Sequence, residues 1–173
     1  MGIALYSDEE RDVEPRCTDW LIACGDTHYA VNRSSFKTYH DLSNAGLDSK
    51  EIKGVGTVEL QVQRSNDSPE IHTLVLENVA HIPGAICNAF CYLRNTHRAI
   101  WDIMTKGFEA GGMPSWYGER VGKFDVLVLA GNAQGESEFR KRVNEGDPYF
   151  TLSLYVSRDD RQKLGLTKRS SGI

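Results

Sequence analysis

The sequence has no apolar run of the roughly 18–20 residues that a membrane-spanning helix needs. It also lacks the basic region and the long apolar region of a secretory signal, because its first residues, MGIALYSDEERDVEPR, turn acidic after a short apolar start. We therefore expect an intracellular protein, cytoplasmic or nuclear, with no membrane partner. In such a compartment the four cysteines are expected to be reduced thiols rather than disulfides.

An excess of basic residues is also missing. The chain has 20 Lys and Arg against 24 Asp and Glu, which gives a formal net charge of −4. Proteins that bind nucleic acid usually attract its phosphates through a positive field, so a nucleic-acid partner is not expected. Two local basic clusters, RNTHR (94–98) and FRKRV (139–143), are interpreted as the solvated ends of short helices.

Paired cysteine motifs are nearly absent. Structural zinc sites usually combine two pairs of cysteines or histidines, each pair separated by a few residues. Cys87 and Cys91 have such a spacing, but Cys17 and Cys24 are too far apart to supply the second pair. The sequence therefore predicts neither a metal site nor a cofactor.

What the chain does contain is a series of short apolar or alternating stretches separated by turns. In GTVELQVQ (56–63), valine and leucine alternate with polar residues, which is the period-two pattern of a half-buried strand. Further strands are predicted at 19–24, 71–82, 124–130 and 149–156. Helices are predicted at 84–95, 136–146 and 157–165, the last with Ser157 as its N-cap, and turns at 64–69 and 107–118. Many short strands with a few short helices predict a mostly β fold, a closed or partly open β-barrel.

Four pieces in order carry a family resemblance: WLIACG (20–25), NRSSFKTYHDL (32–42), IKGVGTVEL (52–60) and LENVAHIPGAICN (76–88). This series resembles the retropepsin-like β-barrel, the aspartic protease domain in polyproteins of Copia-type retrotransposons. The family pattern runs W-[IL]-[LI]-D-S-G, then R-S-x-F, then a G-x-G-T-V strand and a segment that ends near Asn-Leu. The resemblance implies a barrel over 17–130. The charged residues and the proline before it predict a mobile acidic arm at 1–16. The polar, helix-like pieces after it predict a helix and strand extension at 131–173 packed on the barrel, a part of the chain that the resemblance does not cover.

The departures from the family pattern fall on its catalytic parts. The catalytic Asp of the family aligns with Ala23 and the following Ser with Cys24, so that only Gly25 is retained. Aspartic proteases use two carboxylates that share a proton, and each subunit of a retropepsin dimer contributes one. An alanine supplies neither an acid nor a base. The segment SNAGLDSKE (43–51) also lacks the glycine-rich hairpin that covers the substrate in the family.

The resemblance and its departures together imply a catalytically inactive pseudoprotease of retroelement origin that binds protein or peptide as a homodimer. The expected mode is β-augmentation, in which an extended peptide adds to a strand edge in the old substrate groove. The candidate site residues are Ala23, Cys24, Gly25 and Asp26, together with Gly54, Val55, Gly56 and Thr57. Trp116 and Tyr117 are a candidate recognition surface on a turn-rich loop; alternatively they plug the end of the barrel.

Three alternatives stay open at this point. Asp26 would be the acid of an active aspartic-type peptidase, or else a residue that stabilises the turn. Cys24 with His28 would be a thiol nucleophile and its base, or else Cys24 is a small buried thiol that replaces Ser. A nucleic-acid-associated factor would be in keeping with a retroelement origin.

Overall fold

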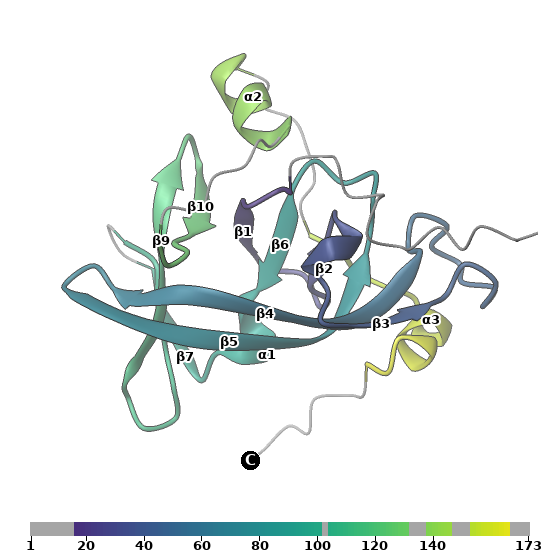
Figure 1. The fold of residues 1–173 in the computed structure, drawn as a ribbon, viewed down its shortest axis with the longest axis horizontal. Helices are drawn as coiled ribbons and strands as arrows, with labels where there is room; N and C mark the ends of the chain where they lie inside the picture. The colour runs from purple at the N-terminus through teal and green to yellow at the C-terminus, as the bar shows by residue number, and fades with distance from the viewer. Residues whose placement is uncertain (1–15, 102–103, 132–137, 147–152, 167–173) are drawn as a thin grey trace, which may run out of the picture.

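The computed structural model describes residues 16–101, 104–131, 138–146 and 153–166, so the predicted arm at 1–16 lies outside them except for Arg16. β-strands are the main regular structure of the described chain, with a few short helices (Figure 1). The strands are β1 (Trp20–Ala23), β2 (Tyr29–Ala30), β3 (Thr38–Asp41), β4 (Gly54–Ser65), β5 (Ser68–His81), β6 (Asn88–Cys91), β7 (Arg98–Ile100), β8 (Lys106–Phe108), β9 (Pro114–Val121) and β10 (Phe124–Leu127). The helices are the 3-10 helix η2 (Arg33–Ser35), α1 (Tyr92–Asn95), α2 (Glu138–Asn144) and α3 (Arg158–Lys163).

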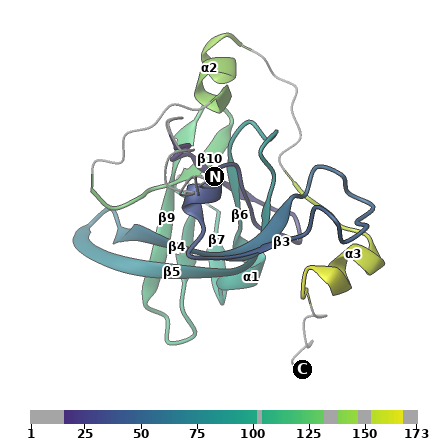
Figure 2. The ribbon, with the colours of Figure 1, turned by 45° about the vertical axis from the view of Figure 1, so that its right-hand side comes forward.

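The prediction of a mostly β fold is confirmed, and the sheet is open rather than closed into a barrel. Its strand order, β3-β4-β5-β2-β6-β1-β10-β9-β8-β7, leaves β3 and β7 as edges. One isolated bridge, between Val62 and Leu129, joins β4 to the residues that follow β10. The long β4–β5 ribbon therefore lies across the other strands (Figures 1 and 2).

The β4–β5 hairpin follows from its alternating sequence. On the buried face Leu60 pairs with Leu74 and Val58 with Leu76, while the exposed Glu59 points to the other face. Burial of one apolar face of an antiparallel pair fixes its register, because a one-residue slip would turn that face to water. The strands predicted at 56–63 and 71–82 and the turn within 64–69 are thus confirmed.

The prediction of a helix at 84–95 is wrong for most of that range. Residues 88–91 form β6, which pairs in parallel with β1, from Trp20 opposite Asn88 to Ala23 opposite Cys91. All four β6 side chains are buried. A strand in the middle of a sheet is covered on both faces, whereas an amphipathic helix buries only one, so the spacing of apolar residues in this stretch was misleading. Only the last residues of the range are helical, as α1.

Two further ranges differ from their predictions. Residues 107–118 do not form turns alone, because β8 and β9 pair there as a hairpin. Of the strand predicted at 149–156, residues 149–152 lie outside the described chain and 153–156 are not in a strand. The side chains of Leu154 and Val156 are partly buried and pack against the apolar interior without forming a strand.

The described parts of the two C-terminal helices confirm their predictions. Ser157 Oγ accepts a hydrogen bond from Asp160 N at 3.1 Å, which makes it the N-cap of α3. Phe139 of α2 is fully buried and packs edge-on against Phe124, with ring centroids 5.5 Å apart. Among the described residues no helix is long and apolar enough to cross a membrane.

Three clusters of apolar side chains form the interior. The first lies beneath the β4–β5 ribbon and contains Phe90 and Trp116. The third joins Phe139 to Leu21 and Cys17. The second cluster contains Ala23, Tyr29, Leu42, Leu47, Ile52, Ala80, Ile82, Ala89, Cys91, Leu164 and Leu166. This second cluster places the end of β1 next to residues from the C-terminal part of the chain.

Candidate functional site

The turn that follows β1 contains no carboxylate at the position where the family has its catalytic aspartate. Ala23 ends β1, and its side chain is buried in the second apolar cluster. A Cβ added at Gly25 would lie 2.8 Å from the carbonyl oxygen and 2.9 Å from the nitrogen of Leu154. Glycine is therefore needed at this position because another part of the same chain passes close to the turn.

Asp26 has no free carboxylate oxygen. Its Oδ1 accepts a hydrogen bond from Thr27 Oγ1 at 2.8 Å, and its Oδ2 forms an ion pair with the Arg161 guanidinium. An acid of a catalytic dyad must share a proton with a second carboxyl group, whereas the partners of the Asp26 carboxylate are a hydroxyl and a guanidinium of its own chain. These contacts favour the interpretation that Asp26 stabilises the turn.

His28 is not placed to act as a base for Cys24. Its Nδ1 accepts a hydrogen bond from Cys91 N at 2.9 Å, so the proton lies on Nε2, which donates to Asn95 Oδ1 at 2.7 Å. Burial lowers the pKa of His28 to about 4, with a smaller contribution from the charge of Arg94. Both ring nitrogens are occupied, so the thiol nucleophile lacks its base. Cys24 itself is exposed, which corrects the expectation of a buried thiol.

Cys24 is expected to be the single reactive thiol of the folded protein. Cys17, Cys87 and Cys91 are buried, and burial raises the pKa of each thiol, to about 12 for Cys91. Because the thiolate is the reactive form, iodoacetamide at mildly alkaline pH should add one adduct to the native chain and four after unfolding. Intact-mass spectrometry counts the adducts. Labelling of the buried cysteines as fast as Cys24 in the native protein would contradict this assignment.

Residues 153–166, called the C-terminal segment below, cross the turn at 23–26. Asp26 N donates a hydrogen bond to Leu154 O at 3.1 Å, and Tyr155 Oη donates to Cys24 O at 3.1 Å. The Leu154 side chain packs on the second apolar cluster, to which Ala23 belongs and against which Val55 packs. The C-terminal segment of the same chain therefore covers the turn that holds the first group of candidate residues.

The same segment holds the loop between β3 and β4. Asp160 is buried, and its carboxylate accepts hydrogen bonds from Asp48 N at 2.8 Å and from Ser49 N at 2.9 Å. Burial raises the pKa of Asp160, but these hydrogen bonds together outweigh it and the pKa is lowered. Ser157 Oγ also donates to Asp48 Oδ2 at 2.9 Å, and Lys163 Nζ donates to Gly46 O at 2.8 Å. Residues 43–51 form no hairpin.

The glycines of the predicted binding strand have a packing role. A Cβ at Gly54 would lie 2.3 Å from the Tyr39 ring, and one at Gly56 would lie 1.9 Å from Thr38 O. Gly54 and Gly56 therefore allow β3 to pair closely with β4.

An open pocket of about 330 Å³ adjoins this strand. Its walls are Thr38, Tyr39, His40, Val55, Gly56, Thr57, Glu77 and Asn78. Asn78 has a φ of 54°, and among the described residues it is the one non-glycine with positive φ. Asparagine tolerates this left-handed conformation, and here it accompanies the register shift between Gly56 and Val58 in the pairing of β4 with β5. Three of the four predicted binding residues of β4 thus line the pocket.

The edge strand β3 forms one side of the pocket. Leu42 N donates to Lys53 O at 2.9 Å. Because backbone groups alternate in an antiparallel ladder, those of Tyr39 and Asp41 point away from β4. No strand of the described chain pairs with that side of β3. The site therefore combines an unpaired strand edge with a pocket.

Trp116 and Tyr117 belong to the core rather than to a recognition loop. Trp116 is fully buried, packs edge-on against Phe90 with centroids 5.2 Å apart, and donates from Nε1 to Thr96 Oγ1 at 3.0 Å. Tyr117 is 9% exposed and its hydroxyl donates to Gln63 Oε1 at 3.3 Å. Of the two interpretations of this pair, interior packing is the one that these contacts favour.

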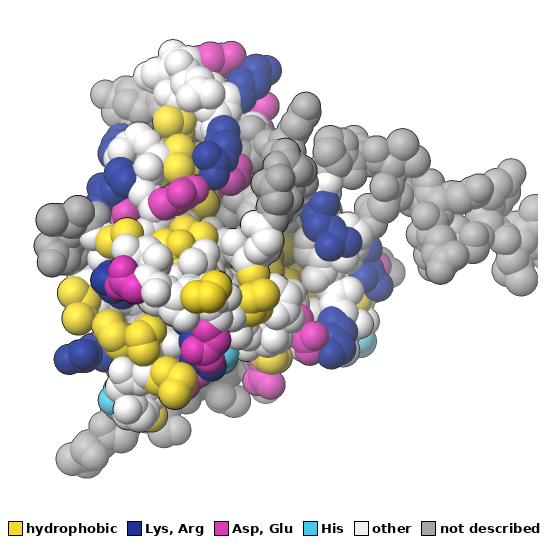
Figure 3. Space-filling view, turned by 60° about the vertical axis from the view of Figure 1, so that its left-hand side comes forward, with side chains coloured by type: hydrophobic (Ala, Val, Ile, Leu, Met, Phe, Trp, Pro, Cys, Tyr) yellow, Lys and Arg dark blue, Asp and Glu magenta, His cyan; other side chains and the backbone are white. Residues whose placement is uncertain are grey.

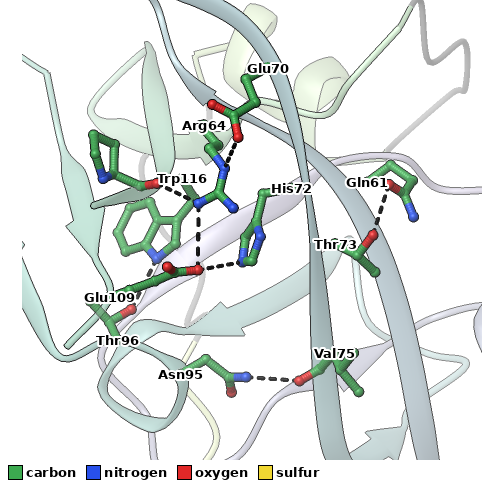
Figure 4. A network of polar contacts seen from close by, with 11 residues as sticks. Gln61, Arg64, Glu70, His72, Thr73, Val75, Asn95, Thr96, Glu109 and Trp116 are labelled. Atoms are coloured by element: carbon green, nitrogen blue, oxygen red, sulfur yellow. Dashed lines mark hydrogen bonds and ion pairs between the residues drawn. The ribbon is translucent and has the colours of Figure 1, made fainter. Parts of the chain in front are cut away.

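A network of charged groups near the β4–β5 tip is structural. Figure 4 shows Arg64 between Glu70 and Glu109, with ion-pair distances of 3.0 and 3.5 Å, and His72 Nε2 3.4 Å from Glu109. Burial lowers the pKa of His72, and the charge of Arg64 lowers it further. These ion pairs tie the hairpin to the loop before β9. No group of three His, Cys, Asp or Glu in the described chain is placed to hold a metal ion.

Several residues that define this region have no recognisable signal in the sequence. Tyr155, Asp160 and Arg161 meet the turn and the loop from more than 100 positions away. The Ser157-x-x-Asp160 pattern signals a helix start, but it does not reveal what the carboxylate binds. Glu77 and Asn78 belong to the piece at 76–88 that carries the resemblance, but nothing in that piece indicated a binding role for them.

The chain matches no protein-family model, no curated protein and no solved structure. The family resemblance therefore rests on the four sequence pieces alone.

Proposed function

We propose that the chain is a catalytically inactive, retropepsin-like domain that binds an extended polypeptide at the edge of β3 and in the adjoining pocket. The observation that carries this proposal is the pocket of about 330 Å³ beside an unpaired strand edge. Exposed strand edges bind peptides through main-chain hydrogen bonds, and neighbouring pockets select the side chains. The backbone groups of Tyr39 and Asp41 would pair with the peptide, and one of its side chains would enter between Thr57 and Glu77.

The site chemistry supports binding rather than cleavage. Ala23 provides no carboxylate, and the Asp26 carboxylate is engaged by Thr27 and Arg161. In the homodimer expected from the sequence, a second copy would face the turn at 23–26. The C-terminal segment of the same chain already contacts this turn, so in this proposal a single chain provides the site.

The nucleic-acid alternative finds less support. Basic and acidic side chains are intermixed on the face shown in Figure 3, and no basic stripe runs across it. Binding to a phosphate backbone depends on such a concentrated positive field.

Thr57→Arg is expected to weaken peptide binding at least about tenfold, because its long side chain would fill the pocket. Peptides are selected from a random display library on the immobilised full-length chain, and their affinity is then measured by calorimetry. Thr73→Arg is the matched control, since Thr73 is an exposed threonine of β5 that does not line the pocket. Equal peptide affinity of the two variants would show that the pocket takes no part in peptide binding.

The same protein should not cleave an unfolded protein substrate at acidic or neutral pH. Cleavage that is lost in Asp26→Ala would overturn the proposal and support the peptidase alternative.

A further inference from the structure

We infer that the turn at 23–26 and the loop at 42–53 together form a second polypeptide-binding site, called the cleft below, and that the C-terminal segment is its displaceable resident occupant. This site is separate from the β3 pocket. It is inferred from how the segment is held, which resembles the binding of a peptide more than the packing of a strand.

The contacts between the segment and the cleft are of three kinds. One main-chain hydrogen bond joins Asp26 N to Leu154 O. Apolar side chains, including those of Leu154 and Leu164, enter the second cluster. Charged side chains then fix the register, with Asp160 on the Asp48 and Ser49 amides and Arg161 on Asp26. These are the main-chain, anchor and charge contacts of peptide recognition.

The segment is not part of the sheet. Residues 153–157 are in no strand, and the bond to Asp26 is the one backbone hydrogen bond that joins them to the turn among the described residues. Side-chain contacts therefore carry most of the attachment. Tyr155, for example, is 67% exposed and holds Cys24 O only through its hydroxyl. Displacement of the segment would expose Leu164 and Leu166, which are buried in the second cluster, but it would remove no strand from the sheet.

The groups that line the cleft indicate which kind of segment can bind there. The two amides of Asp48 and Ser49 are aimed at one carboxylate, Asp26 is aimed at one guanidinium, and Gly25 leaves room for a passing main chain. The occupant supplies these groups in the order Leu154-x-Val156-Ser157-x-x-Asp160-Arg161. The expected partner is therefore a segment with two alternating apolar residues, a Ser or Thr cap, and an acidic residue followed by Arg.

The test uses a fluorescent peptide of residues 153–166 and the full-length chain with Asp160→Asn. The substitution changes the occupant and leaves every residue of the cleft intact. An amide cannot reproduce the charge that both amides face, so the tethered segment loses its hold and the added peptide takes its place. Fluorescence anisotropy should show at least tenfold tighter peptide binding to Asp160→Asn than to the wild type. Asp159→Asn is the matched control, because Asp159 is the exposed neighbour on the same helix.

Two further arms keep the result decisive. If Asp160→Asn does not fold, Arg161→Gln replaces it, since this variant loosens the segment at Asp26 and keeps the Asp160 contacts; tighter peptide binding is again expected. A peptide that itself carries Asn in place of Asp160 should not bind. Folded variants that bind the peptide no better than the wild type would overturn the inference. Thr57→Arg, which fills the β3 pocket, should not change binding of this peptide. A negative result for the cleft therefore does not bear on the proposal for the β3 pocket, which the Thr57→Arg experiment tests separately.

Discussion

Replacing Trp116 with alanine is expected to lower the free energy of unfolding by about 3–5 kcal/mol, the range for loss of a fully buried Trp or Phe side chain. The indole packs on Phe90, and its Nε1 donates to Thr96 Oγ1. Gly107 lies directly against it, where a Cβ would be 2.1 Å from the ring. Close packing on both sides means that the cavity has little freedom to collapse, which places the loss toward the upper part of that range.

Trp101→Ala is the matched control for this experiment. Trp101 is 48% exposed and contacts the Tyr92 ring edge-on, with centroids 5.0 Å apart. Its removal should cost about 1 kcal/mol, the size of one aromatic pair. Denaturant unfolding followed by far-ultraviolet circular dichroism measures both variants. Similar losses for the two would show that Trp116 does not have the buried position described for it.

The second large effect is a loss of stability in acid that depends on His28. The unfolded chain takes up a proton near the ordinary pKa of 6.5, whereas burial holds the folded pKa at about 4. Between these values the unfolded chain binds a proton that the folded chain excludes, so acid favours unfolding. The contribution is fully present above pH 6.5 and is lost as the pH falls toward about 4. Its size is about 3 kcal/mol, from roughly 1.4 kcal/mol for each pKa unit.

His28→Gln isolates this contribution from other groups that titrate in acid. His72 and Asp160 also have lowered pKa values, and both destabilise the fold as pH falls. Those contributions persist in the variant. The free energy of unfolding, measured at several pH values between about 4 and 7, should therefore fall less steeply in His28→Gln than in the wild type. Equal pH dependence of the free energy of unfolding in the two proteins would show that groups other than His28 cause the loss of stability in acid.

The parts of the fold that were predictable are those decided by local pattern. Val58 and Leu60 alternate with polar residues, so they identify β4 without knowledge of its partner. Ser157 identifies the start of α3 because capping depends only on the next few residues. In contrast, Asn88–Cys91 is buried on both faces by strands from elsewhere in the chain, and no local period distinguishes such a strand from a helix.

The candidate site was predictable only in part, for the same reason. The resemblance placed attention on Ala23 and Thr57, which lie in or beside the two regions proposed to bind polypeptide. It gave no indication of what covers the turn, because Arg161 and Asp26 have no shared motif and meet only in the folded chain. Trp116 was ambiguous because an aromatic residue between glycines suits an exposed loop and a tightly packed hairpin equally well.

The long sequence separation between the turn and its cover has a consequence during protein synthesis. Asp26 and Arg161 are 135 positions apart, and a ribosome that adds about 5–20 residues per second needs several seconds to travel between them. The strands that shape the turn, β1 and β6, are complete by Cys91. Between the synthesis of Cys91 and that of residues 153–166, the turn at 23–26 therefore has no C-terminal segment to cover it. The C-terminal segment, which would compete with any partner for this cleft, is thus the last part of the described chain to be synthesised.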